Sequence, residues 1–306
     1  MTRHLLDVTD FTVDEVAAIL DMAEAPIESL GAPLTGLGAS LIFEKPSNRT
    51  RHSMEMAVVQ LGGHPVYTRG EEVGLDTREP VEDVAAIMAG YHAVIAARVF
   101  EHSTVERMAA AVSAHGSDVP IVNMLSDWSH PLQAFADALT MQQRLGSLVG
   151  RTVAYVGDYA NVARSLAEIS LLLGMRVRLA CPTGFDADDV ELERLSLIGD
   201  GDIAQTTRPE DAVAGAHAVH TDTWVSMGQE QDKAARRRAF EGYGVDSAMM
   251  QAAADDAIFM HCLPAYRGFE VQADVIDGPQ SAVFQQGHNR MHAARAALAF
   301  ILGAGS

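Results

Sequence analysis

Residues 47–51 (SNRTR) gather hydroxyl, amide and guanidinium groups within one short segment. The segment follows the apolar run at 41–43 and precedes apolar residues at helical spacing, so the pattern predicts a turn from a strand into a helix. Backbone N–H groups in the first turn of a helix have no partner within the helix, and the helix dipole is positive there. Hydroxyl and guanidinium donors at such a turn favour a phosphate ligand, although a solvated helix start with surface arginines gives the same pattern.

Three more polar residues of the first half stand where predicted strands end or helices begin. Arg98 follows the apolar run at 93–97, while His130 and Gln133 open the helix predicted after the next run. An arginine can neutralise an oxyanion, a histidine can donate to a carbonyl oxygen, and a glutamine can accept from an amide. Each is a weak signal by itself, since a histidine before a proline is most often a helix cap. Together they fit a ligand that has both a phosphate and an amide-like carbonyl.

The chain has two cysteines, and only one of them has polar neighbours in the sequence. Cys262 lies in the segment 261–268 (HCLPAYRG), which follows a predicted strand and also contains His261. A buried structural cysteine is the usual explanation for such a residue, so the segment alone leaves a functional thiol open. Cys181 ends an apolar run, and we assign it to the core.

A second polar segment, 221–230 (TDTWVSMGQE), also follows a predicted strand. The carboxylate of Asp222 could hold an ammonium group, and Ser226 with the turn at Met227 could contact an amino acid, although a plain surface loop is the alternative. The segment 156–165 (VGDYANVARS) has a glycine turn before a helix but lacks the G-x-G-x-x-G pattern. A dinucleotide site is therefore poorly supported.

The overall composition is that of a globular protein with an acidic surface. Of 306 residues, 48% are hydrophobic and 21% charged, and 41 acidic against 22 basic residues give a net charge of −19. This charge argues against nucleic acid or an anionic membrane as a partner, because the long-range field repels phosphate. Two cysteines are too few for a disulfide framework, and the first residues lack the pattern of a secretory signal. We therefore expect a cytoplasmic protein with free thiols.

Short apolar runs alternate with helical patterns along the chain. Thr12 and Glu15 have capping-box spacing at the start of the first helix. The predicted strands cover 40–43, 65–67, 93–97, 120–123, 152–156, 176–181, 202–204, 218–221 and 257–260. Alternation of this kind predicts an α/β fold with two lobes, each a parallel sheet covered by helices. We expect the active site in the cleft between the lobes, because ligands bind at the carboxyl ends of parallel strands.

The break at 146–150 (GSLVG) places the expected domain boundary between residues 147 and 148. This gives one domain of residues 1–147 and another of residues 148–306. The last helical pattern, 288–302, is expected to pack back across the first domain.

Five segments together resemble the ornithine carbamoyltransferase family, in its order and at about its spacing. They are 43–51, 130–133, 222–230, 261–268 and the pair Asn289 and Arg290. The resemblance spans nearly the whole chain, and five coincident motifs are far more specific than any one of them. It implies two α/β lobes, assembly into homotrimers or multiples of trimers, and carbamoyl phosphate and L-ornithine as substrates. It implies no cofactor and no metal ion.

The resemblance also implies a role for individual residues. Those that would bind carbamoyl phosphate are Ser47, Asn48, Arg49, Thr50, Arg98, His130, Gln133, Leu263 through its backbone carbonyl, and Arg290. Those that would bind ornithine are Asn161, Asp222, Ser226 and Met227. The residues with a catalytic role would be Arg98, His130, Asp222, Cys262 and Arg290.

The chain departs from the family pattern at two places. Asn48 stands where the family usually has threonine. The segment 70–80 (GEEVGLDTREP) stands where the family usually has a loop with serine and glutamine that reaches into a neighbouring subunit. Either phosphate is held without that contribution, Arg69 or Arg78 replaces it, or the preferred substrate differs.

Three alternative functions follow from these observations. Transfer to another amine, such as putrescine or a modified ornithine, is the alternative within the same superfamily. A dinucleotide-dependent dehydrogenase lacks its glycine pattern. A non-catalytic relative would be expected to lack Arg98, His130 or Cys262, and all three are present. The residues do not distinguish work in arginine synthesis from work in arginine breakdown, because both directions use the same groups.

Overall fold

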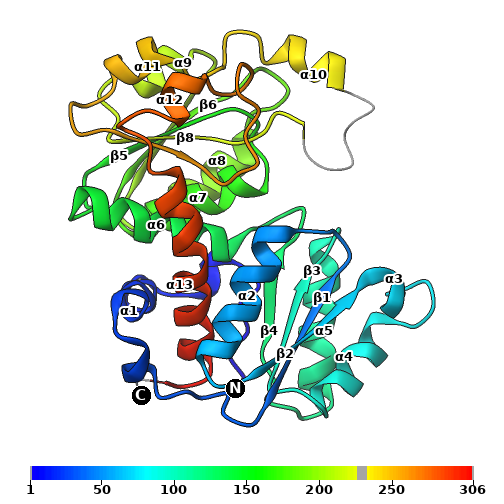
Figure 1. The fold of residues 1–306 in the computed structure, drawn as a ribbon. Coiled ribbons are helices and arrows are strands. Elements are labelled where there is room, and N and C mark those ends of the chain that lie inside the picture. Colours follow the sequence, from blue (N-terminus) through cyan, green and yellow to red (C-terminus); the bar gives the residue numbers. More distant parts are fainter. Residues whose placement is uncertain (1, 226–232, 305–306) are drawn as a thin grey trace. The chain divides into compact units, whose positions relative to one another are not determined.

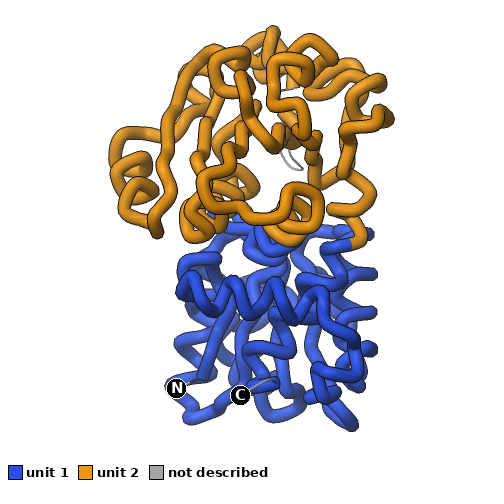
Figure 2. The backbone as a smooth tube through the Cα atoms, turned by 90° about the vertical axis from the view of Figure 1, so that its left-hand side faces the viewer, with its two compact units in different colours: residues 1–136, 289–306 blue, residues 137–288 orange. Residues whose placement is uncertain are grey.

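The computed structural model describes residues 2–225 and 233–304 of the chain (Figure 1). These residues form two compact units, which Figure 2 shows in different colours. Unit 1 comprises residues 1–136 and 289–306, and unit 2 comprises residues 137–288. The boundaries fall within two long helices, α6 (Pro131–Leu145) and α13 (Val283–Ile301).

Unit 1 is built around a parallel sheet of four strands in the order β2-β1-β3-β4. The strands are β1 (Gly38–Phe43), β2 (His64–Arg69), β3 (Val94–Arg98) and β4 (Ile121–Leu125). All five residues of β3 are buried, as expected of a central strand covered on both faces. The register pairs Phe43 with Arg98, so the chain leaves β1 beside the guanidinium at the end of β3.

Helices cover both faces of this sheet. Figure 1 shows α2 on one face and both α4 and α5 on the other. The second layer packs Val84 and Val105 against Ile42 and Ile95 of the strands. The helices of this unit, besides parts of α6 and α13, are α1 (Val13–Glu24), α2 (Asn48–Gln60), α3 (Gly70–Val73), α4 (Val81–Ala89) and α5 (His102–Ala114), with 3-10 turns η1 (Val8–Asp10) and η2 (Ile27–Leu30).

Unit 2 is built around a parallel sheet of five strands in the order β7-β6-β5-β8-β9. The strands are β5 (Thr152–Val156), β6 (Arg176–Ala180), β7 (Asp202–Thr206), β8 (Ala218–Thr221) and β9 (Ile258–His261). Two separate apolar clusters, one around Tyr155 and one around Phe240, belong to this unit. Its other helices are α7 (Asn161–Leu172), α8 (Asp189–Ser196), α9 (Pro209–Val213), α10 (Lys233–Ala239), α11 (Ser247–Ala252) and α12 (Ala273–Ile276).

Each sheet contains one point where the chain reverses the direction in which strands are added. In unit 1 this point lies between β1 and β3, and in unit 2 between β5 and β8. Loops diverge on opposite sides of such a point, which leaves a crevice at the carboxyl ends of the strands. The topology therefore favours one ligand site in each unit, after β1 and β3 in the first and after β5 and β8 in the second.

The expected α/β class with two parallel sheets is confirmed, and every predicted strand corresponds to an observed one. The predicted capping box is also present, because Thr12 accepts from the Glu15 backbone and Glu15 accepts from the Thr12 backbone. Helix α13 begins at Val283, earlier than the predicted start at 288. Among the helices of residues 2–225 and 233–304, none is long and apolar enough to cross a lipid bilayer.

Candidate active site

The predicted phosphate segment lies where β1 passes into α2. Ser47 is the N-cap of α2, and its hydroxyl accepts from the backbone N–H of Thr50 at 3.3 Å. Asn48 and Arg49 occupy the first turn of this helix, where backbone N–H groups and the helix dipole favour an anion. Arg51 is held elsewhere, because it pairs with Glu55 at 2.8 Å and its guanidinium lies 3.7 Å from the centre of the Tyr67 ring.

Thr50 is the centre of a buried polar cluster in unit 1. Its hydroxyl oxygen accepts from Arg98 Nη1 at 3.3 Å and from Arg290 Nη2 at 3.0 Å. Arg290 Nη1 also donates to the side-chain oxygen of Gln133 at 2.5 Å. None of these four side chains is more than 6% exposed. Two guanidinium groups therefore meet at one hydroxyl in a place shielded from water, where an anion would be strongly attracted.

His130 belongs to the same cluster and is only 3% exposed. Burial holds the pKa of its imidazole well below the usual range, and the positive charges of Arg290 and Arg98 lower it further. The ring is therefore neutral at pH 7. A neutral imidazole still has one N–H, so it can donate to a carbonyl oxygen without adding a third positive charge.

Lys45 is a member of this region that the sequence did not single out, although it lies within the same segment. Partial burial lowers the pKa of its ammonium group, and the charge of Arg98 lowers it further. The ammonium nitrogen lies 4.7 Å from the centre of the Phe100 ring. The signal that could have identified it is its place between a strand end and the phosphate segment.

The unusual segment 70–80 forms the short helix α3 and a turn. Its Asp76 pairs with Arg107 at 2.7 Å, and this contact lowers the pKa of the Asp76 carboxyl. Arg78 also makes a contact within this segment, because its Nη1 lies 3.5 Å from the Glu72 carbonyl oxygen. Arg78 also lines a cavity of about 280 Å³ with Ser40, Thr68 and Val84.

In unit 2, the predicted acceptor residues gather at the ends of β8 and β9. Cys262 Sγ donates to Asp222 Oδ1 at 3.1 Å, and the same oxygen accepts from the backbone N–H of Thr223 at 2.8 Å. Asp222 and Cys262 are both half-buried, so neither side chain is sealed from solvent. Asn161 opens α7 after β5, and its side-chain oxygen accepts from Val162 N at 3.0 Å. Ser226 and Met227 lie outside the described residues.

His261 supports the turn that contains Cys262 and Leu263. Its Nδ1 accepts from the backbone N–H of Leu263 at 2.9 Å, which places the proton of a neutral ring on Nε2. Nε2 lies 3.4 Å from the carboxylate of the buried Glu270. Leu263 has φ +59°, a left-handed conformation that side chains rarely adopt. One possible metal-ligand atom from each of Asp222, His261 and Cys262 lies within 4.8 Å of the other two, so the three could bind one cation together.

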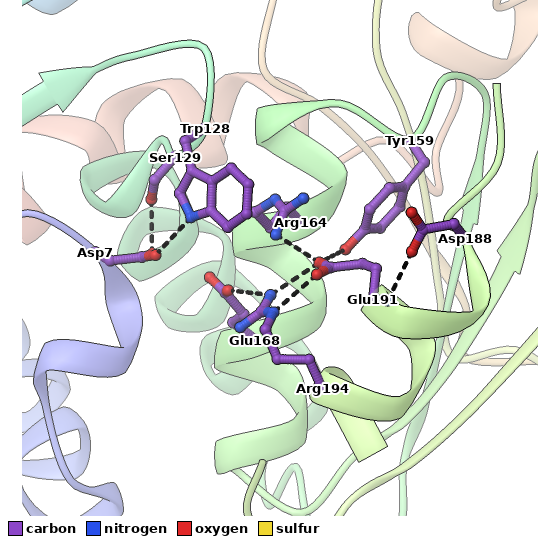
Figure 3. Close-up of polar contacts among 9 residues, drawn as sticks. All are labelled: Asp7, Trp128, Ser129, Tyr159, Arg164, Glu168, Asp188, Glu191 and Arg194. Atoms are coloured by element: carbon purple, nitrogen blue, oxygen red, sulfur yellow. Dashed lines mark hydrogen bonds and ion pairs between the residues drawn. The ribbon is translucent and has the colours of Figure 1, made fainter. Parts of the chain in front are cut away.

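Figure 3 shows two sets of polar contacts that hold residues next to the site, one in each unit. In unit 1, Asp7 accepts from Ser129 Oγ at 2.8 Å and from the indole N–H of Trp128 at 3.2 Å, immediately before His130. In unit 2, Glu191 accepts from the hydroxyl of Tyr159 at 2.6 Å. Tyr159 lies two residues before Asn161 in the sequence.

Glu191 is the centre of the second set of contacts in Figure 3. It pairs with Arg164 of α7 at 2.6 Å and with Arg194 of α8 at 2.8 Å. Arg194 also pairs with the fully buried Glu168 at 2.7 Å. The network thus fastens the turn after β5 to two helices. The sequence did not identify Asp7 or Glu191, because neither lies in a recognisable motif.

The fold and the two polar sites define a class of transferase, and comparisons with known proteins agree. Residues 3–143 match the family model "Aspartate/ornithine carbamoyltransferase, carbamoyl-P binding domain". Residues 149–301 match the model "Aspartate/ornithine carbamoyltransferase, Asp/Orn binding domain". The chain belongs to the aspartate/ornithine carbamoyltransferase family.

Within the family, its similar relatives include ornithine carbamoyltransferases. The one from Thermus thermophilus is 43% identical over 304 residues, which cover 99% of this chain and 97% of that protein. The catabolic ornithine carbamoyltransferase of Halobacterium salinarum is 42% identical, covering 96% and 97%. Among solved structures, the ornithine carbamoyltransferase from Pyrococcus furiosus has a TM-score of 0.91 and 38% identity, covering 99% of this chain and 98% of that one.

Proposed function

We propose that this protein transfers the carbamoyl group of carbamoyl phosphate to the side-chain amine of L-ornithine, giving L-citrulline and phosphate. The observation that carries the proposal is the buried cluster in which Arg98 and Arg290 meet at Thr50. Such a cluster suits a small dianion with a carbonyl group, and the full-length similarity to ornithine carbamoyltransferases supports ornithine as the acceptor. The reaction belongs to arginine metabolism.

Most of the groups that bind carbamoyl phosphate in this proposal belong to unit 1. The phosphate oxygens accept from the start of α2, where the residues are Ser47, Asn48, Arg49 and Thr50. Arg98 and His130 donate to the carbonyl oxygen, while Gln133 and the Leu263 carbonyl accept from the carbamoyl amide. Arg290 holds Gln133 and Thr50 in place and adds positive charge for the phosphate.

Ornithine is bound by residues of unit 2. Asn161, Asp222, Ser226 and Met227 bind it, and Cys262 lies with Asp222 beside the amine that reacts. The contact between Cys262 Sγ and Asp222 supports this assignment, because a thiol and a carboxylate at 3.1 Å offer two acceptors to one ammonium group. An acceptor with a second carboxylate, such as aspartate, would be repelled by Asp222.

The chemical step needs a neutral amine and a stabilised oxyanion. An alkyl ammonium group has a pKa near ~10.4, so the amine must lose a proton before its nitrogen attacks the carbamoyl carbon. The new C–N bond forms a tetrahedral intermediate whose oxyanion accepts from Arg98 and His130. The C–O bond to phosphate then breaks, and the departing phosphate takes a proton from the nitrogen.

The same proposal covers organisation and assembly. We assign carbamoyl phosphate binding to residues 1–147 and ornithine binding to residues 148–306, and we propose a cytoplasmic homotrimer or a multiple of trimers. Exposed apolar side chains on one part of unit 1 support association with a second copy. Val66 on the outer strand β2 is 39% exposed, and Met56 and Val59 on α2 are 44% and 49% exposed. Light scattering coupled to size-exclusion chromatography tests this, and a monomer at all concentrations would refute it.

Citrulline formation from carbamoyl phosphate tests the function, with ornithine compared with putrescine, lysine and acetylornithine at equal concentrations. A preference for ornithine is the expected result. Product from another amine would point to the second candidate, a carbamoyltransferase for a modified ornithine or a diamine. The unusual segment 70–80 favours that candidate. A related fold at 27% identity and TM-score 0.85 belongs to an N-acetyl-L-ornithine transcarbamylase.

A further inference from the structure

Helix α10 supplies one side chain that contacts both loops of the proposed ornithine site. Arg236 Nη2 donates to the carboxylate of Asp158, in the turn between β5 and Asn161. Arg236 Nε donates to the backbone carbonyl of Trp224 at 2.5 Å, two residues after Asp222. One guanidinium therefore connects the loops on the two sides of the point where the sheet reverses direction.

The surroundings of Arg236 differ from those of an ordinary surface arginine. Only 12% of its side chain is exposed, and its partner Asp158 is 17% exposed. Its guanidinium carbon lies 4.8 Å from the centre of the Phe185 ring and 5.7 Å from that of Phe240. Aromatic rings on a guanidinium reduce its freedom and leave its N–H groups pointing at fixed acceptors.

A cation at this position offsets the negative charge of Asp158, which pairs with Arg236. Burial raises the pKa of the Asp158 carboxyl, the Arg236 guanidinium lowers it, and the negative charge of Asp222 raises it again. Asp158 and Asp222 are thus close enough to repel each other. With Arg236 paired to Asp158, Asp222 is the carboxylate left to attract the ammonium group of a substrate.

We propose that Arg236 is a positioning residue for ornithine. Through its hydrogen bonds to Asp158 and to the Trp224 carbonyl, it fixes the loops of Asn161 and Asp222 relative to each other. The inference rests on the proposed function, because it assumes that these loops bind ornithine. An arginine suits the task because its planar fork donates in two directions at once, to a carboxylate and to a carbonyl.

The next residue along the helix provides a matched control. Arg237 carries the same charge on the same helix, but it is exposed and its guanidinium lies over Phe269, 3.9 Å from the ring centre. The variants Arg236→Met and Arg237→Met therefore change net charge and helix composition equally. Arg236→Met removes hydrogen bonds to both loops, whereas Arg237 shares with the second loop only the lining of a pocket.

The test measures KM for ornithine, KM for carbamoyl phosphate and kcat in both variants. We expect Arg236→Met to raise the KM for ornithine about tenfold or more, with the KM for carbamoyl phosphate unchanged within about twofold. Arg237→Met should leave both constants at the wild-type level. An unchanged ornithine KM in Arg236→Met, or an equal rise of both KM values, would overturn the inference.

Two further variants separate positioning from a general loss of structure. Arg236→Lys keeps the charge but cannot donate in both directions, so its ornithine KM should lie between those of the wild type and Arg236→Met. The double variant Asp158→Asn/Arg236→Met should bind ornithine better than Arg236→Met, because no unpaired carboxylate remains to compete with Asp222. A wild-type KM in Arg236→Lys, or independent effects in the double variant, would contradict the proposal.

Hydrogen–deuterium exchange without substrate tests the coupling separately from the reaction. Arg236→Met should speed exchange in both 157–161 and 221–225, and Arg237→Met in neither. If the wild-type protein makes no citrulline, the proposed function fails, while exchange in the two loops still decides whether Arg236 connects them. Unchanged exchange in Arg236→Met would refute the connection even in an active enzyme.

Discussion

Replacing His130 by alanine tests whether a neutral imidazole stabilises the oxyanion. His130 is 3% exposed, so water has little room to take over its hydrogen bond in the presence of substrate. Loss of one oxyanion donor typically costs 10²- to 10³-fold in kcat, and we expect a fall of about this size. His130→Gln should recover part of the loss, because the glutamine amide can also donate. Citrulline formation is measured at pH 8 with both substrates saturating. A kcat within about threefold of the wild type in His130→Ala would refute the assigned role.

The same residue predicts a pH dependence of stability. Burial and the charges of Arg290 and Arg98 hold its pKa well below 6.5, the ordinary value for the unfolded chain. Below pH 6.5 the unfolded state therefore binds a proton that the folded state does not, so stability falls as the pH falls. Between pH 7.0 and 5.5 the contribution of this one group is a loss of about 1 kcal/mol in the free energy of unfolding.

Urea unfolding of wild type and His130→Gln at these two pH values measures that contribution. The variant lacks the imidazole, so its stability should fall by about 1 kcal/mol less than that of the wild type over the same interval. Equal losses in the two proteins would mean that His130 is readily protonated in the folded state.

Three other substitutions or treatments test the remaining parts of the structure. Burial raises the pKa of the Cys181 thiol to about 12, so iodoacetamide at pH 8 should label Cys262 first and Cys181 only after unfolding. Peptide mass spectrometry measures the labelling of each cysteine. Equal labelling of both in the folded protein would contradict this prediction. Glu191→Ala should lower the free energy of unfolding by about 2 kcal/mol, because it removes the common partner of Arg164 and of the partly exposed Arg194. The exposed Asp211→Ala should change it by less than about 0.5 kcal/mol in the same urea experiment. Asp7→Ala should lower kcat about three- to tenfold without changing the ornithine KM, because it removes the hydrogen bond to Ser129 that holds the turn before His130. A changed KM with an unchanged kcat would argue against that effect.

The elements of the fold were predictable because their signals are local. Apolar runs marked the strands, and the spacing of Thr12 and Glu15 marked a helix start that the structure contains. The meeting of residues 47–51 with Arg98 also followed from sequence, since parallel strands bring their carboxyl ends to one edge of a sheet. Their roles toward substrates stay predictions.

The contacts that support the site could not be read from the sequence in the same way. Arg236 and Asp158 are 78 residues apart, and Asp7 and Ser129 are 122 apart. No local pattern distinguishes Arg236 from its neighbours, because three arginines follow one another in α10. Which of them faces the loops depends on how the helix packs against Phe185 and Phe240, and that is a property of the tertiary structure.

The strongly acidic surface and the anionic substrate are compatible because they act over different distances. At physiological ionic strength, charges on the surface are screened beyond about 8 Å, so the net charge of −19 contributes little at the base of a site. Arg98 and Arg290 are 6% and 5% exposed, and their attraction for an anion is much less screened than that of surface charges. In the proposed site, the affinity for a phosphate group is therefore set by a few buried donors. An acidic protein can hold such a ligand only where its cations are gathered and shielded, as they are around Thr50.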